Sequence, residues 1–170
     1  RHLSDRVKTF REDSIWVQLP QACWRVAGGD DASGNICTFA FLAATLALKT
    51  LDDVQDGHQP PSCSNEGMAL SFHALELLGA LPTLDFRQIT RLQRSYTNVL
   101  LKLCAGQHLD LLGQMNVQCI LDHSWTIARK KTAQWFAWGA SLYPRYAGDE
   151  ATENTLAEFG THIGLMHQLA

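Results

Sequence analysis

One long apolar segment constrains the fold of this chain more than any other part of the sequence. It runs from Ile36 to Leu51 and ends directly in a group of aspartates. Residues 33–56 are predicted to form one helix, and its apolar side chains lie on nearly every side, which is typical of a helix at the centre of a bundle. Gly57 follows as a helix stop. Alternating β-branched runs bounded by turns, the usual sign of strands, are nearly absent, so the sequence predicts an all-α fold.

Helical periodicity extends over the rest of the chain. Further helices are expected over residues 14–27, 66–78, 82–112, 115–142 and 152–170. The helix over 115–142 should stop before Pro144, because proline disrupts a helix interior. The chain has 170 residues and contains no repeat or long linker, so we expect a single domain over residues 1–170.

Composition and charge exclude several classes of partner. The formal net charge is −3 and the basic residues are scattered, which argues against binding to nucleic acid. The run from Ile36 to Leu48 is too short to span a bilayer, so no transmembrane segment is expected. The five cysteines form an odd set without CxxC spacing, which is typical of free buried thiols. These observations predict a soluble protein of the reducing cytoplasm.

The aspartates after the apolar run form a DDxxD motif, Asp52, Asp53 and Asp56. Acids are disfavoured in the last turn of a helix, where the helix dipole is negative. Asp52 and Asp56 also share one face, where like charges repel by a few tenths of a kcal/mol. A bound cation would relieve both effects, and hard carboxylate ligands with positions left for water and phosphate suit Mg²⁺. The simpler interpretation is a solvated helix end.

Three more polar clusters fall on separate predicted helices. They are Gly106-Gln107-His108-Leu109-Asp110-Leu111, Lys130-Lys131-Thr132-Ala133 and the segment from Phe159 to Gln168. Each has a structural explanation as well: a lysine pair is usually a solvated face, and the G-x-x-x-G spacing in the last segment permits close helix packing. One of the two lysines is nevertheless flanked by apolar residues, which indicates that it points inward. The aromatic residues Trp125, Trp135, Phe136 and Trp138 are expected in the core or at a subunit interface.

Taken in order, these motifs resemble the trans-isoprenyl diphosphate synthases, or polyprenyl synthetases. The four segments are DDVQDG, GQHLDL, KTA and FGTHIGLMHQ, and the resemblance covers roughly residues 20–170. It implies an isoprenoid-synthase-type helical bundle around a central apolar cavity. It also implies a homodimer, the usual assembly of the family.

The resemblance implies a prenyltransferase that condenses an allylic diphosphate with isopentenyl diphosphate after Mg²⁺-assisted loss of pyrophosphate. Asp52 and Asp56 would be metal ligands, supported by Asp53. Lys131 would bind the allylic diphosphate, with Thr132 beside it. The pocket would further be lined by Gln107 and Gln168, with Asp110 as a polar neighbour. Its apolar walls would exclude water from the carbocation.

The residues one turn before the aspartates bear on product length. Ala47 and Leu48 lie roughly one turn deeper on the same predicted helix, where the resemblance places the growing prenyl tail. In the family a bulky aromatic there blocks elongation. The small side chain of Ala47 would leave room for a longer product, with Leu48 as a candidate floor.

The sequence departs from the family pattern in three places. No arginine occurs in residues 57–63, where a pair is expected, and the G-K-R motif is missing upstream. The second aspartate-rich motif would begin after Ala170, so the domain is expected to lack that C-terminal part. Besides the synthase, the sequence therefore leaves open a non-catalytic or regulatory subunit, a class I terpene cyclase or prenyl tailoring enzyme, and a helical protein-interaction module.

Overall fold

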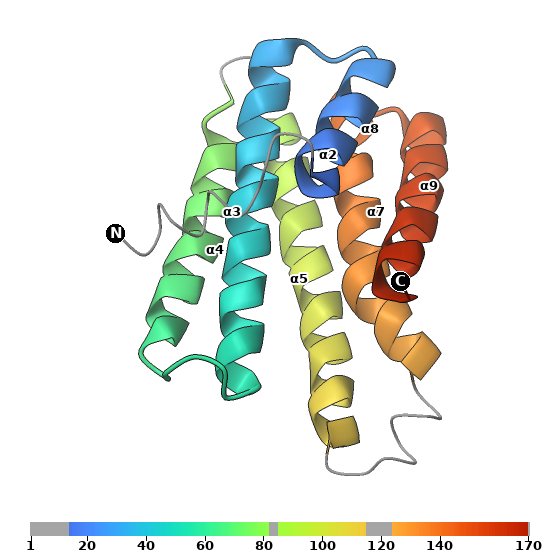
Figure 1. Cartoon of the computed structure of the whole chain (residues 1–170). Coiled ribbons are helices and arrows are strands. Elements are labelled where there is room, and N and C mark those ends of the chain that lie inside the picture. The colour runs from blue at the N-terminus through green and yellow to red at the C-terminus, as the bar shows by residue number, and fades with distance from the viewer. Residues whose placement is uncertain (1–13, 82–84, 115–123, 170) are drawn as a thin grey trace. The chain divides into compact units, whose positions relative to one another are not determined.

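A computed structural model describes residues 14–81, 85–114 and 124–169 of the chain (Figure 1). Every regular element in these ranges is a helix, which confirms the predicted all-α class. The chain divides into two compact units, Arg1–Ile89 and Thr90–Ala170. The expected single domain over residues 1–170 stays a prediction, as does the central cavity.

The first unit contains the helices α2 (Ile15–Val26), α3 (Asp31–Gln55) and α4 (Cys63–Gly79). The long apolar segment of the sequence forms α3, which packs against both α2 and α4, as predicted for a central helix. Figure 1 shows α3 and α4 side by side and antiparallel, joined by the loop that follows the aspartates.

Local sequence signals fix both ends of α3. The carboxylate of Asp30 accepts a hydrogen bond from the Ser33 backbone N–H at 2.8 Å, so Asp30 caps the N-terminus. At the C-terminus Gly57 adopts a φ of +76°, a left-handed conformation that glycine tolerates best. The predicted helix over residues 33–56 is therefore confirmed within two residues at each end.

The helix α3 is also long and apolar enough to cross a membrane, judged by length and composition alone. Its most apolar 18-residue window is 56% buried inside the protein, as is common for the core helix of a water-soluble domain. Among the described residues no other helix meets this test. This is weak evidence, and the expectation that the chain has no transmembrane segment stays a prediction.

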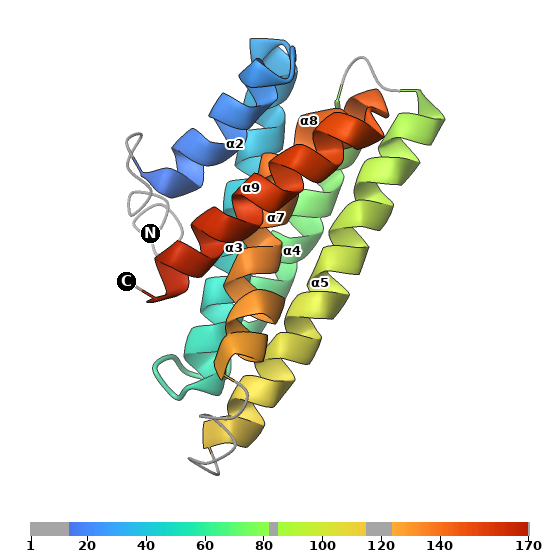
Figure 2. The same cartoon turned by 90° about the vertical axis from the view of Figure 1, so that its right-hand side faces the viewer.

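The second unit contains most of α5 (Phe86–Gln114), a π-helical turn η1 (Arg129–Ala133), and then α7 (Gln134–Ala140), α8 (Leu142–Ala147) and α9 (Glu150–Leu169). Figure 2 shows α9 lying along α7, and these two helices pack closely. The first residues of the predicted helix over 115–142, residues 115–123, lie outside the described part of the chain.

The predicted end of this helix at residue 142, before Pro144, is confirmed within two residues, but its π turn was not predicted. The helix contains the π turn, ends at Ala140, and a separate short helix then begins at Leu142. Pro144 lies in the first turn of α8, where its missing N–H breaks no helical hydrogen bond. The Ser141 hydroxyl donates to the Ala137 carbonyl at 2.8 Å and stabilises the break.

Aromatic side chains form the core of the second unit. The rings of Trp135 and Trp138 stack at 5.0 Å between centroids, and Tyr96 from α5 packs on Trp138 at 5.4 Å. The Trp138 indole N–H donates to the buried Ser95 hydroxyl at 3.0 Å, which satisfies the polar end of the ring. The predicted core role of these tryptophans is confirmed, whereas Trp125 is 52% exposed.

Candidate functional site

The π turn η1 carries two of the predicted site residues, Lys131 and Thr132. Short π-helical turns inside a helix are rare and occur often at functional sites, because the extra residue redirects the side chains of that turn. Lys130 is exposed to solvent, while Lys131 is mostly buried and points inward. This confirms that one lysine of the pair faces the protein.

The Lys131 ammonium is paired with the carboxylate of Asp110 from α5. The Nζ–Oδ2 distance is 2.6 Å, and the two side chains are 23% and 30% exposed. A pair at this distance and burial is stronger than a typical surface ion pair, because water screens it less. The structure therefore brings together two residues that lie 21 positions apart in the sequence.

Thr132 is joined to the last helix by a short side-chain hydrogen bond. Its hydroxyl donates to the amide oxygen of Gln168 on α9. The Lys131–Asp110 and Thr132–Gln168 contacts both start from η1 and reach different helices of the same unit. Four of the candidate residues thus meet in pairs around the π turn.

The amide of Gln107 has no hydrogen-bond partner in the described part of the chain. Both its Oε1 and its Nε2 are buried. Gln107 lies three residues before Asp110, so the two side chains share one face of α5. A buried amide without partners is costly in a folded protein, and such a group is normally satisfied by water or a ligand. The Gln107 amide is therefore an unsatisfied hydrogen-bond donor and acceptor on the same face of α5 as Asp110, the partner of Lys131.

Glycines on both neighbouring helices allow this close approach to the π turn. A Cβ atom at Gly106 on α5 would lie 3.0 Å from Lys131 Cγ. A Cβ at Gly164 on α9 would lie 2.7 Å from the Ala133 Cα, and one at Gly160 would lie 2.5 Å from the Phe136 carbonyl oxygen. The predicted packing role of the G-x-x-x-G segment is confirmed.

The predicted metal ligands lie in the first unit, at the C-terminal end of α3. Asp52 and Asp53 are partly buried and Asp56, the C-cap residue, is exposed. Lys49 pairs with Asp53 at 3.1 Å, although Lys49 is itself 70% exposed and the pair is therefore weak. The Asp56 N–H donates to the Asp52 carbonyl at 2.9 Å, so these two residues lie one helical turn apart on one face.

The donor chemistry of this helix end fits magnesium only in part. Among the described residues, no group of three or more His, Cys, Asp or Glu side chains is gathered closely enough to hold a metal. Asp52 and Asp56 offer hard carboxylate oxygens one turn apart, and Mg²⁺ is commonly bound by one or two carboxylates with substrate phosphate and water completing its shell. The pair is therefore suited to share an Mg²⁺ ion with a diphosphate.

The structure places the residues expected to set product length on the same helix. Ala47 is buried and belongs to an apolar cluster with Leu46 and Leu70, while Leu48 is partly exposed. A Cβ at Gly67 of α4 would lie 3.2 Å from the Ala47 carbonyl oxygen, so the two helix backbones approach closely here. The role of Ala47 and Leu48 in product length stays a prediction.

Sequence reasoning did not single out Glu66, which lies in the first turn of α4. Its Oε1 is buried and has no hydrogen-bond partner among the described residues. Glu66 directly precedes Gly67, where a Cβ atom would lie 2.8 Å from Cγ of Leu51, the residue before the aspartates. The only sequence signal is an acid at a helix N-terminus, which the helix dipole explains equally well.

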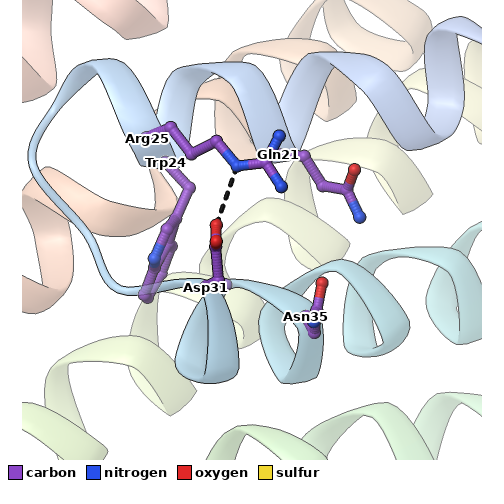
Figure 3. A pocket seen from close by; sticks show the side chains of 6 residues that line it. Gln21, Trp24, Arg25, Asp31 and Asn35 are labelled. Carbon is purple, nitrogen blue, oxygen red and sulfur yellow. Dashed lines mark hydrogen bonds and ion pairs between the residues drawn. The ribbon is translucent and has the colours of Figure 1, made fainter.

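A small hollow between α2 and α3 contains none of the predicted site residues (Figure 3). It is lined by Gln21, Trp24, Arg25, Asp31, Gly34 and Asn35. An ion pair of 2.8 Å between Arg25 and Asp31 crosses it. Both of these side chains are well exposed, so the hollow is a surface feature of the first unit.

The described part of the chain is all-helical, as the resemblance to polyprenyl synthetases implies. A family model for polyprenyl synthetases matches residues 60–170, and the chain belongs to the polyprenyl synthetase family. The matched range includes Gln107, Lys131 and Gln168, and it begins after the DDVQD segment.

A solved structure shows the same fold. The crystal structure of a polyprenyl synthetase from Streptomyces coelicolor A3(2) is similar to this chain, with a TM-score of 0.70 and 24% sequence identity. The similarity covers 87% of this chain and 47% of that one, so the chain spans about half the length of that structure. A search of curated proteins found no significant match.

Proposed function

We propose that the chain acts as a prenyltransferase that condenses an allylic diphosphate with isopentenyl diphosphate. Family membership supports this class of activity. The proposal rests on two polar groups near η1. They are the inward-pointing ammonium of Lys131 and the buried amide of Gln107, which has no hydrogen-bond partner among the described residues. A cationic group and an unsatisfied amide together suit a diphosphate, which is an anion rich in hydrogen-bond acceptors.

Each predicted residue has a distinct task in this proposal. Asp52 and Asp56 would hold Mg²⁺, which when bound neutralises the leaving diphosphate. Lys131 would add a fixed positive charge for diphosphate oxygens. Thr132 and Gln168, joined by their hydrogen bond, would line the pocket. Asp53, which forms a weak ion pair with Lys49, would support the helix end.

The decisive experiment is calorimetric titration of the chain with geranyl diphosphate or farnesyl diphosphate, with Mg²⁺ and with a chelator. We expect binding that requires Mg²⁺ and weakens at least about tenfold in Asp52→Ala. Asp31→Ala is the matched control, because it removes an exposed aspartate from the other end of the same helix. It should bind as the wild type does.

A turnover assay with isopentenyl diphosphate then separates the candidate activities. Release of pyrophosphate with a lengthened prenyl product supports the synthase. Pyrophosphate release without chain extension would indicate a cyclase or tailoring enzyme, and binding without turnover would indicate a non-catalytic subunit. Equal binding by the wild type and Asp52→Ala, or no binding by either, would refute the proposal. The expected homodimer and cytoplasmic location stay predictions.

A further inference from the structure

The ion pair between Lys131 and Asp110 carries an inference that rests on the proposed function and goes beyond it. We propose that Asp110 is a positioning residue: it holds the Lys131 ammonium in place and weakens the binding of a metal-free diphosphate at that ammonium. The site would thereby select a diphosphate whose charge a divalent cation has already reduced.

The position of Lys131 is constrained at both ends of its side chain. Its stem lies against α5 at Gly106, where a Cβ atom would come within 3.0 Å of Lys131 Cγ. Its ammonium lies 2.6 Å from Asp110 Oδ2, one helical turn further along α5. A lysine side chain normally has many rotamers, and fixing it costs up to about 2 kcal/mol of conformational entropy. Here that ordering is already complete before any ligand binds.

The same contact places a negative charge where an anion would bind. A diphosphate oxygen that approaches the Lys131 ammonium also approaches the Asp110 carboxylate. Both side chains are mostly buried, with 23% and 30% exposed, so water screens this repulsion less than at the surface. Like charges that face each other in a binding site lower affinity substantially and act as a specificity device.

Gln107 indicates the face of α5 at which a ligand would bind. Its two buried amide atoms have no partner among the described residues, and it shares a face of α5 with Asp110. A diphosphate at this place would accept from the Gln107 amide and from Lys131 while facing Asp110. At this place Lys131 would raise the affinity for the bare anion and Asp110 would lower it.

The test is titration of the full chain with inorganic pyrophosphate, in a chelator and again with Mg²⁺. The variants are Asp110→Asn, Asp110→Glu, Lys131→Gln and the double variant Asp110→Asn/Lys131→Gln, each checked for helical content. We expect Asp110→Asn to bind metal-free pyrophosphate about tenfold more tightly than the wild type. The gain should vanish in the double variant, and Asp110→Glu should behave like the wild type.

Two controls test whether the gain in pyrophosphate affinity of Asp110→Asn comes only from the changed net charge or from a folding defect. Asp31→Asn makes the same change in net charge at an exposed position and should leave the affinity unchanged. Acetylation of Lys131, followed by mass spectrometry and compared with exposed Lys130, should be faster in Asp110→Asn than in the wild type. This readout needs no ligand. Exposed Lys130 is the reference for the reactivity of a free lysine, and unchanged helical content of Asp110→Asn excludes a general loss of structure.

The outcomes distinguish this inference from the proposed function. If the wild type binds pyrophosphate with Mg²⁺ but Asp110→Asn gains no metal-free affinity, the inference is overturned and the function stands. An equal gain in Asp31→Asn would overturn it as well, and so would unchanged acetylation of Lys131. If no protein binds pyrophosphate under any condition, the proposed function fails, and the inferred selection against the free anion fails with it.

Discussion

The substitution Gly164→Ala tests whether close backbone contact builds the site around the π turn. The added Cβ would lie 2.7 Å from the Ala133 Cα and 2.8 Å from the Thr132 carbonyl oxygen. Both are backbone atoms, so neither can move aside by a change of rotamer. The helix α9 must shift away from η1, and Gln168, one turn further on, must move with it.

Two opposing contributions set how much Gly164→Ala changes the free energy of unfolding. Alanine is favoured over glycine inside a helix by roughly 1 kcal/mol. Overpacking of a rigid contact costs typically about 1–3 kcal/mol. With backbone atoms on the opposing side we expect the upper part of that range, and thus a net loss of about 1–2 kcal/mol. For a chain of 170 residues this lowers Tm by roughly 3–6 °C.

Thermal unfolding followed by circular dichroism measures this loss, and Gly106→Ala provides a graded comparison. The Cβ added at Gly106 would lie 3.0 Å from Lys130 Cβ and Lys131 Cγ and 3.1 Å from the Lys130 backbone carbon; these contacts are longer than those at Gly164, so its cost should be smaller. Gly164→Ala should also weaken binding of an allylic diphosphate more than Gly106→Ala does, because it displaces Thr132. A Gly164→Ala protein that is as stable as the wild type, or more stable, would refute the reasoning, since helix propensity alone would then decide.

Two further predictions concern titrating groups. Burial raises the pKa of the Cys37 thiol to about 12 and that of Cys23 to about 11, so a thiol reagent at pH 8 should modify exposed Cys104 rapidly and these two only after unfolding. Peptide mass spectrometry checks this, and rapid modification of Cys37 in the native protein would contradict it. Hydrogen bonds from the Thr152 hydroxyl and backbone lower the pKa of Asp149, the capping carboxylate before α9. A lowered pKa stabilises the fold above the unfolded-state value of about 4 and ceases to do so as the pH falls below it. The Tm difference between the wild type and Asp149→Ala should therefore shrink below about pH 4, and a constant difference down to pH 2 would argue against the cap.

The helices could be predicted because their signals are local. The N-cap at Asp30, the stop at Gly57 and the long apolar run between them define α3 without reference to the rest of the chain. The inward direction of Lys131 could also be predicted, since apolar residues flank it in the sequence. In each case the sequence pattern and the local backbone agree, which is when such reasoning is reliable.

The π turn and the pairing of Asp110 with Lys131 could not be predicted. Residues 129–133 contain no proline or glycine that marks an irregular turn. The ion pair joins residues 21 positions apart, so its existence depends on how α5 meets η1. The break at Ser141 is equally hard to predict, because a proline such as Pro144 can mark the end of one helix or the first turn of the next.

The π turn lets the residues before it point in a different direction from the one that a regular helix leading into the aromatic core would give them. A π turn contains one residue more than an α-helical turn, so the residues before it are rotated by about 100° relative to those after it. Trp135 and Trp138 lie after η1 and stack on each other there. Deleting a single residue, Lys130, would remove the extra residue, and in a continuous α-helix it would turn the preceding segment by that angle relative to the core. A one-residue change in length would thus alter the direction of the proposed site without changing a side chain of the core.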